Sequence, residues 1–156
     1  MDEVVFRARR AADLAECVAA LRAVHEADGY PTNWPAEPQR WLTPPSLLQA
    51  WVAETGSICG HVAVRQASEA GSAEVSRLFV TPAARRRSVA SALLRQAAQW
   101  AAERQCRLTL NVVDEHRSAA IACYESSGWR HTHTTTADWT TSHGEAVRLR
   151  HYVLTA

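Results

Sequence analysis

The stretch of residues 75–94 constrains this chain more than any other, because it combines a strand, a cationic turn and a helix. Strand-forming side chains fill residues 75–80 and end at Pro82, which lacks the backbone donor that sheet pairing needs. Three arginines follow at residues 85–87. Alanine and leucine then recur at three- and four-residue spacing over residues 90–101, which is typical of a helix with one buried face.

The start of this helix is predicted to bind an anion. The first turn of a helix leaves backbone N–H groups without intrahelical partners, and the positive end of the helix dipole lies there. The small residues Ser88, Ala90 and Ser91 stand at this start, and the arginines of residues 85–87 add positive charge. The pattern predicts a phosphate or pyrophosphate ligand. A solvated basic turn that only precedes an ordinary helix is the alternative interpretation.

Composition indicates one globular domain over residues 1–156, long enough to bury a core, with 47% hydrophobic and 21% charged residues. A net charge of +1 argues against nucleic acid as a partner. We expect no membrane association, since no apolar run approaches the roughly 20 residues of a membrane span and the first residues do not resemble a signal peptide. The four cysteines are scattered, which favours reduced thiols in a cytoplasmic protein.

The remaining hydrophobic patterns complete a mixed α/β domain. Strands are predicted at residues 4–6, 50–54, 58–64, 75–80 and 108–113, with two more between residues 130 and 155. Helices are predicted at residues 11–27, 86–103 and 115–127. Prolines indicate a loop with one short helical turn over residues 30–45, and residues 137–144 are predicted to form a polar loop.

Two segments are similar to the CoA-binding motifs of the GNAT acyltransferase superfamily. The first is Arg85-x-x-Ser88-x-Ala90, which resembles the family pattern Arg/Gln-x-x-Gly-x-Gly/Ala after the fourth strand. The second resembles Asn-x-x-Ala-x-x-x-Tyr-Glu-x-x-Gly-Phe/Trp, and its matching residues are Ala120, Tyr124, Glu125, Gly128 and Trp129. The chain departs from these patterns at Ser88, where the family has glycine, and at Arg117, where the family has asparagine.

This resemblance implies the GNAT fold, in which a mostly antiparallel central sheet splays between its fourth and fifth strands and is flanked by helices. It implies acetyl-CoA as the cosubstrate, with the pantetheine arm against the backbone of residues 78–80, and no metal. The implied cofactor-binding residues are Leu78, Phe79, Val80, Arg85, Arg86, Arg87, Ser88, Val89, Ala90, Ser91, Arg117 and Ala120.

The resemblance also implies acetyl transfer to a primary amine by direct attack in a ternary complex. The attacking nitrogen must be neutral, and deprotonating a lysine-like amine near pH 7 costs roughly 4–5 kcal/mol. Glu74 is the expected base, because some family members place a glutamate early in the fourth strand, ahead of the phosphate turn. Tyr124 is expected to stabilise the leaving sulfur by a hydrogen bond. A strand-end glutamate and a core tyrosine are the alternative interpretations of these residues.

The amine acceptor is not specified by the sequence. A small-molecule or peptide amine is expected, and the candidate substrate-binding residues are Tyr30, Trp34, Asp138, Trp139 and His143. Of these, only Asp138 could attract a cationic amine. A homodimer is possible on the sequence alone. An alternative function is a catalytically silent CoA sensor or interaction module on the same fold, because Ser88 and Arg117 depart from the family motifs.

Overall fold

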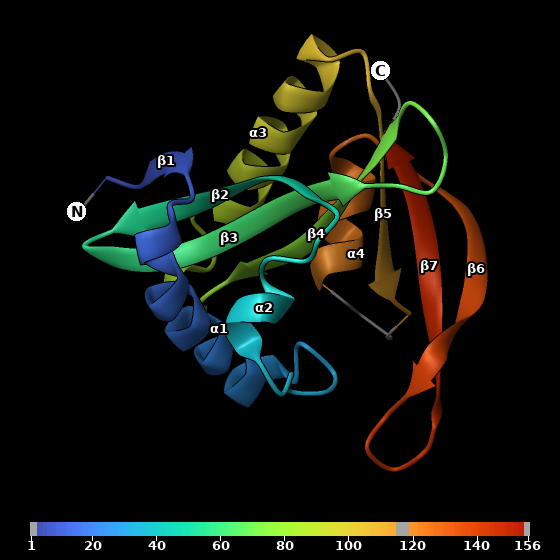
Figure 1. Cartoon of the computed structure of the whole chain (residues 1–156), viewed down its shortest axis with the longest axis horizontal. Coiled ribbons are helices and arrows are strands. Elements are labelled where there is room, and N and C mark those ends of the chain that lie inside the picture. The colour runs from blue at the N-terminus through green and yellow to red at the C-terminus, as the bar shows by residue number, and fades with distance from the viewer. Residues whose placement is uncertain (1–2, 115–118, 155–156) are drawn as a thin grey trace.

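The computed structural model describes residues 3–114 and 119–154 (Figure 1). Its strands are β1 (Val5–Ala8), β2 (Leu47–Thr55), β3 (Ser57–Gln66), β4 (Ser72–Val80), β5 (Arg107–Val113), β6 (Trp129–Thr140) and β7 (Ala146–Leu154). Its α-helices are α1 (Leu14–Asp28), α2 (Pro38–Trp41), α3 (Val89–Glu103) and α4 (Ala119–Ser126), and short 3-10 turns occupy Ala11–Asp13 and Pro82–Ala84. The order of elements along the chain agrees with the prediction.

Within the described residues, the strands form one seven-stranded sheet in the order β1-β2-β3-β4-β5-β7-β6. β4 and β5 pair in parallel, whereas every other neighbouring pair is antiparallel. The parallel pair arises because α3 carries the chain back to the starting end of β4 before β5 begins. This mixed sheet with flanking helices confirms the expected fold class.

β4 and β5 separate part-way along their length. Their pairing begins at Ser72 and ends with Val75 opposite Leu110. On its other side, β4 stays paired with β3 as far as Val80 opposite Gly60. Among the described residues, the β4 edge that faces β5 is therefore unpaired by β5 from residue 76 to residue 80. Its backbone groups are available to a ligand, except for the carbonyls of Arg77 and Val80, which accept side-chain hydrogen bonds. This is the predicted splay.

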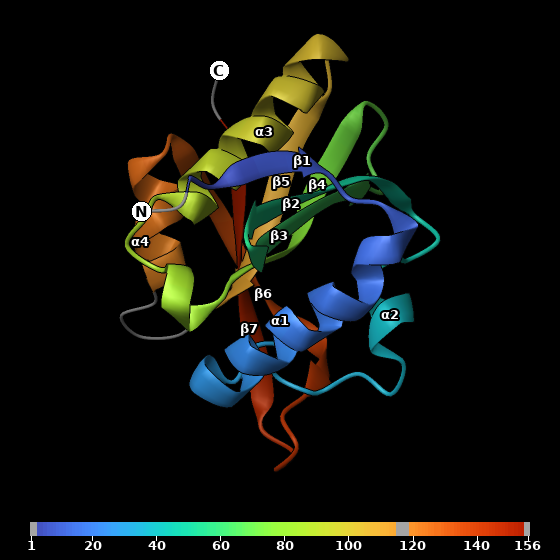
Figure 2. The same ribbon diagram turned by 90° about the vertical axis from the view of Figure 1, so that its left-hand side faces the viewer.

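Helices cover both faces of the sheet (Figure 2). α3 and α4 lie on one face, where Val89, Leu93 and Ala97 of α3 enter the larger hydrophobic core. Gly60 of β3 allows α3 to approach closely, because a Cβ there would lie only 3.0 Å from the Val89 side chain. α1 and α2 lie on the opposite face, and α1 buries Leu21 completely. The splay therefore lies between two helical layers.

Two helix predictions differ from the structure at their starts. α3 begins at Val89 instead of residue 86, because Arg86 and Ser88 have φ angles of 63° and 58°, which interrupt a right-handed helix. The predicted helix over residues 115–127 is described only from Ala119 to Ser126. Arg117 lies outside the described residues.

The C-terminal hairpin differs from the predicted polar loop. β6 continues to Thr140 because it pairs with β7 through to Ala146, so Asp138 and Trp139 lie on a strand. Only the short segment between the two strands, which includes His143, forms the turn. In the part of the chain that the structure describes, no helix is long and apolar enough to span a membrane.

Candidate active site

β4 carries a bulge at the point where it leaves β5. Residues 77 and 78 oppose the single residue Val62 of β3, because the register shifts there. Arg77 has a φ of 54°, in the left-handed region that a non-glycine residue rarely adopts. The bulge turns the β4 backbone at the mouth of the splay, which is the place predicted to receive the pantetheine arm.

The buried side chain of His61 supports this bulge. Its Nδ1 lies 2.8 Å from the carbonyl oxygen of Arg77, and its Nε2 lies 3.0 Å from Nη1 of Arg9. Arginine can only donate, so Nε2 accepts from Arg9 and Nδ1–H donates to the Arg77 carbonyl. Burial lowers the pKa of His61 to about 4, and this keeps the ring neutral near pH 7. His61 also stacks on Phe79, with ring centroids 5.1 Å apart.

The side chains of the predicted β4 contacts point away from the open edge. Phe79 is buried in the core under α1, whereas Leu78 and Val80 pack against the core under α3. Phe79 can therefore reach a ligand only through its backbone groups, whereas Leu78 and Val80 keep part of their side chains exposed. For Phe79, this agrees with the expectation that residue identity matters little along the open edge.

The three arginines of the turn have different surroundings. Arg85 donates from Nε and Nη2 to the carbonyl oxygen of Val80, at 3.3 and 3.1 Å, and forms an ion pair with Asp28 at the end of α1. Arg85 therefore ties the turn to β4 and α1, and its contact with phosphate stays a prediction. Arg86 is exposed. Arg87 is exposed too, and it is close enough to Cys59 for its charge to oppose the rise in thiol pKa that burial causes.

The first turn of α3 presents its backbone at the end of the splay. Ser88 adopts the left-handed conformation at the helix N-cap, and its side chain makes no capping hydrogen bond. Val89 is buried, so it could contact a ligand only through its N–H group. Ala90 and Ser91 are partly exposed, and Ser91 Oγ lies 3.7 Å from Sγ of Cys123 on α4. Ala120 lies on α4 as well.

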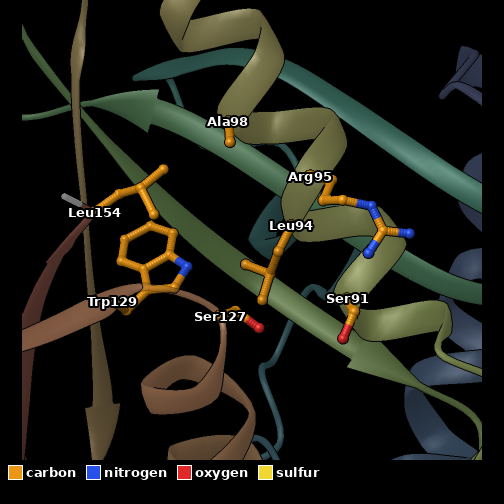
Figure 3. A pocket seen from close by; sticks show the side chains of 7 residues that line it. All are labelled: Ser91, Leu94, Arg95, Ala98, Ser127, Trp129 and Leu154. Atoms are coloured by element: carbon orange, nitrogen blue, oxygen red, sulfur yellow. The ribbon is translucent and has the colours of Figure 1, made fainter. Parts of the chain in front are cut away.

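A pocket of about 210 Å³ lies beside this turn, between α3 and the ends of β6 and β7 (Figure 3). Leu94, Trp129 and Leu154 supply its apolar surface, and Ser91 stands at its border with the helix start. Arg95 extends away from Trp129 in Figure 3. The pocket thus extends along α3 from the first turn of the helix.

Tyr124 lies on α4 and is only 7% exposed. Its ring makes an edge contact with Trp129, with centroids 6.3 Å apart, and lies 6.0 Å from the ring of Tyr152. No described residue forms a hydrogen bond with its hydroxyl, and burial raises its pKa well above the usual value of 10. Tyr124 is therefore suited to donate a hydrogen bond, because the hydroxyl keeps its proton.

Glu74 lies on β4 opposite Thr109 of β5, before the splay opens. Arg65 of β3 binds its Oε1 from Nε and Nη2, at 3.0 and 2.6 Å. Oε2 makes no hydrogen bond with a described residue. Glu74 is thus fixed by an ion pair and keeps one free carboxylate oxygen.

Tyr30 and Trp34 lie in the loop between α1 and α2. Tyr30 is near enough to Tyr124 for its phenol to affect the pKa of Tyr124. Burial raises the pKa of Tyr30 to about 12. Trp34 packs on α1 instead, with Arg22 4.5 Å above its ring and His25 5.3 Å away.

The C-terminal hairpin supplies the other candidate substrate residues, Asp138, Trp139 and His143, and all three are exposed. Nδ2 of Asn33 in the α1–α2 loop donates to the carbonyl oxygen of Thr140, at 3.0 Å. Loop and hairpin therefore meet over the sheet face that α1 and α2 cover. We call this face, together with loop residues 29–37 and the β6–β7 hairpin, the acceptor side.

Sequence reasoning missed two residues on this side. The available signal for Arg77 was its charge, because it stands beside the apolar residues that end the strand. His151 gives no sequence signal, because its position depends on β7 pairing with β5, where it lies opposite Asn111. Its ring stacks on His133 at 4.3 Å, and burial together with His133 lowers its pKa. Among the described residues, no group of three or more His, Cys, Asp or Glu side chains could hold a metal ion.

Residues 14–129 match the acetyltransferase (GNAT) family. The chain belongs to this family. The match contains both motif segments and the whole splay, and family membership supports an acyltransferase activity. No curated protein matches the sequence.

Solved GNAT structures share the fold at low sequence identity. The Escherichia coli ribosomal-protein-S18-alanine N-acetyltransferase has a TM-score of 0.77 and 18% identity, covering 97% of this chain and 93% of that chain. The Brucella melitensis ribosomal-protein-alanine N-acetyltransferase has a TM-score of 0.76 and 21% identity, covering 97% and 99%. Arabidopsis thaliana NAA60, solved in complex with acetyl-CoA, has a TM-score of 0.74 and 16% identity, covering 97% of each chain.

Proposed function

We propose that this protein is an N-acetyltransferase that moves an acetyl group from acetyl-CoA to a primary amine in a ternary complex. The open β4 edge carries this proposal, because it leads directly into a cationic turn and the start of a helix. Coenzyme A has the matching parts in the same order. Its amide-containing arm suits a strand edge, and its pyrophosphate suits a helix start.

The residues around the splay fit this cosubstrate. The backbone of residues 78–80 offers donors and acceptors that β5 does not use, although the Val80 carbonyl accepts from Arg85. The N–H groups of residues 89–91 lie at the helix start, and the exposed Arg86 adds charge beside them. We retain Arg85, Arg87, Arg117 and Ala120 as proposed contacts from the motif resemblance.

In the proposed reaction, the neutral amine nitrogen attacks the thioester carbonyl carbon, and the carbon–sulfur bond then breaks. The nitrogen passes its extra proton to a base, and the sulfur leaves as a thiolate. We assign Tyr124 the hydrogen bond to that sulfur, because its protonated hydroxyl has no other partner among the described residues. Such a bond strengthens as charge develops, which lowers the barrier.

Glu74 is our proposed base, acting through Oε2 directly or through a water molecule. His151 is a second candidate, because its lowered pKa favours the neutral ring that accepts a proton. The pH dependence of kcat/KM in Glu74→Gln and His151→Gln separates the two residues. The base is the residue whose substitution removes the fall in kcat/KM at low pH. If Glu74→Gln keeps this fall unchanged, Glu74 is not the base.

The acceptor would enter from the acceptor side, where Tyr30, Trp34, Asp138, Trp139 and His143 remain proposed contacts. A small-molecule or peptide amine suits an opening between a loop and a hairpin. A homodimer and a cytoplasmic location remain proposals.

Calorimetric titration with coenzyme A, followed by thiol release from acetyl-CoA with a panel of amines, tests the function. We expect saturable binding to one site and turnover with at least one amine. Saturable binding without turnover of any amine would favour the silent sensor module. An absence of saturable binding would overturn both functions.

A further inference from the structure

The acceptor side carries two arginines that no carboxylate of the described residues contacts directly, although Glu74 is near enough to Arg77 to oppose the fall in its pKa. Arg65 is paired with Glu74, as described above. Arg9 and Arg77 form no ion pair within the described part of the chain, although both are partly buried. Burial lowers the pKa of each guanidinium, which means that each charge has lost part of its hydration.

These two arginines differ in how their donors are used. Arg9 donates from Nη1 to the Leu42 carbonyl oxygen and from Nη2 to Oγ1 of Thr43, both at 2.8 Å. Its terminal nitrogens are therefore committed to the end of α2 and to His61. Arg77 donates only from Nε, to the Trp41 carbonyl oxygen at 3.0 Å. Nη1 and Nη2 of Arg77 donate to none of the described residues.

The guanidinium of Arg77 is held in a fixed orientation. Its central carbon lies 3.8 Å from the centroid of the Trp41 ring, and the Nε bond to the same residue prevents rotation. The two terminal nitrogens therefore form a fork whose position is set before any ligand arrives. A planar carboxylate accepts two parallel hydrogen bonds from such a fork.

Arg77 also lies beside the path of the reaction. It occupies the bulge at which β4 leaves β5, so it stands at the mouth of the splay. Tyr30 is near enough to affect the pKa of both Arg77 and Tyr124, and its ring makes an edge contact with Trp41 at 6.2 Å. Because Arg77 occupies this bulge, a ligand on its fork would be held on the acceptor side, at the mouth of the splay.

Building on the proposed function, we propose that Arg77 binds a carboxylate of the acceptor. The acceptor is then a small amine that also carries a carboxylate, such as a free amino acid, and not a polycationic amine. The exposed Asp138 does not change this assignment, because Arg77 lies deeper and its fork is uncommitted.

The test compares amino acids with their carboxamides, using methionine, tryptophan and glutamine as matched pairs. The carboxamide has the less basic amine, so without carboxylate recognition it would be the better substrate at pH 7. We expect kcat/KM to be at least ten-fold higher for the amino acid in the native protein. We expect Arg77→Gln to abolish or invert that preference, and Arg77→Lys to restore part of it.

Arg40→Gln is the matched control, because Arg40 is an exposed arginine of α2 that, among the described residues, pairs only with Glu37. It should keep the preference of the native protein. Binding of the same pairs to the CoA complex, measured by calorimetry, gives a readout that does not require turnover. CoA affinity within two-fold of native shows that the Arg77 variants are folded.

The outcomes separate this proposal from the proposed function. Equal binding of acid and carboxamide by the native protein, or a higher kcat/KM for the carboxamide, contradicts the role of Arg77, even if acetyl transfer occurs. A preference that survives in Arg77→Gln contradicts it as well. A native protein that does not bind CoA removes the proposed function, and direct titration of the amino acids then tests Arg77 alone: failure to bind any of them overturns the proposal.

Discussion

The two sides of the splay are built in different ways. The side that we propose binds CoA, here called the CoA side, is one continuous segment from residue 76 to residue 91. It offers mainly backbone groups, because Val89 is buried and Leu78 and Val80 pack against the core. The acceptor side is assembled from side chains of the α1–α2 loop, β4, β7 and the C-terminal hairpin. A site made of backbone groups can keep its hydrogen-bonding pattern when the side chains change. A site made of side chains changes with each substitution, so it can set the acceptor specificity of an individual protein.

The largest expected effect is a loss of stability at low pH caused by His61, which supports the β4 bulge on the acceptor side. The folded-state pKa of His61 is about 4 and its unfolded value is 6.5, so its contribution to stability is complete above pH 6.5 and is lost as pH falls through 4. The loss amounts to about 3 kcal/mol. Urea unfolding at several pH values between 7 and 3.5 should show it.

His61→Gln should flatten the pH dependence of stability between pH 6.5 and 4. Asp13 serves as an internal control, because hydrogen bonds from Arg7 lower its pKa from 3.8 to about 2 and its stability loss therefore falls at lower pH. Identical slopes for the native protein and His61→Gln between pH 6.5 and 4 would show that His61 does not support the bulge in this way.

Tyr124→Phe tests the proposed hydrogen bond from Tyr124 to the leaving sulfur. The variant keeps the ring that packs on Trp129 and removes only the hydroxyl. We expect kcat to fall about 100-fold, with a CoA dissociation constant within about two-fold of native. Steady-state kinetics and calorimetry measure the two quantities. Unchanged activity at every pH would remove Tyr124 from the mechanism.

Charge reversal in the turn tests the CoA side. Arg86→Glu should weaken CoA binding by about ten-fold or more, and the loss should shrink at high salt because the site is exposed. Arg85→Gln should instead lower the melting temperature, because Arg85 ties the turn to Val80 and Asp28. Arg40→Glu on the opposite face is the matched control. Equal CoA binding by Arg86→Glu and Arg40→Glu would contradict a phosphate site at this turn.

The smallest expected effect is at Ser88. A left-handed conformation costs a non-glycine residue about 1 kcal/mol or more, so Ser88→Gly should stabilise the protein or tighten CoA binding by up to about 1 kcal/mol. Ser91→Gly is the opposite case, because glycine inside α3 should destabilise it by about 0.5–1 kcal/mol. Thermal unfolding and calorimetry measure both variants, and destabilisation by both would contradict the strain at Ser88.

The strand, turn and helix of the proposed CoA side could mostly be predicted from the sequence, because their signals are local, whereas the binding of CoA there stays a prediction. The start of α3 was misplaced by three residues, since Arg86 and Ser88 carry no sequence signal for positive φ. The β6 extension to Thr140 was missed because threonines read as polar when the partner strand is unknown.

Most of the acceptor side could not be predicted in this way. Tyr30 was found by its aromatic character, but its nearness to Tyr124 depends on how the loop folds over the sheet. His151 faces Asn111 only through strand pairing, and the fixed fork of Arg77 depends on Trp41, thirty-six residues away. Long-range pairing and side-chain packing decide such contacts, and neither has a local pattern.

Amide hydrogen exchange with and without coenzyme A tests the central claim most directly, because that claim concerns backbone groups. The account predicts slower exchange at residues 76–80 and 89–91 when CoA is added, with little change at the distant β1–β2 pair. Unchanged exchange in both segments under saturating CoA, or protection confined to other parts of the chain, would contradict it.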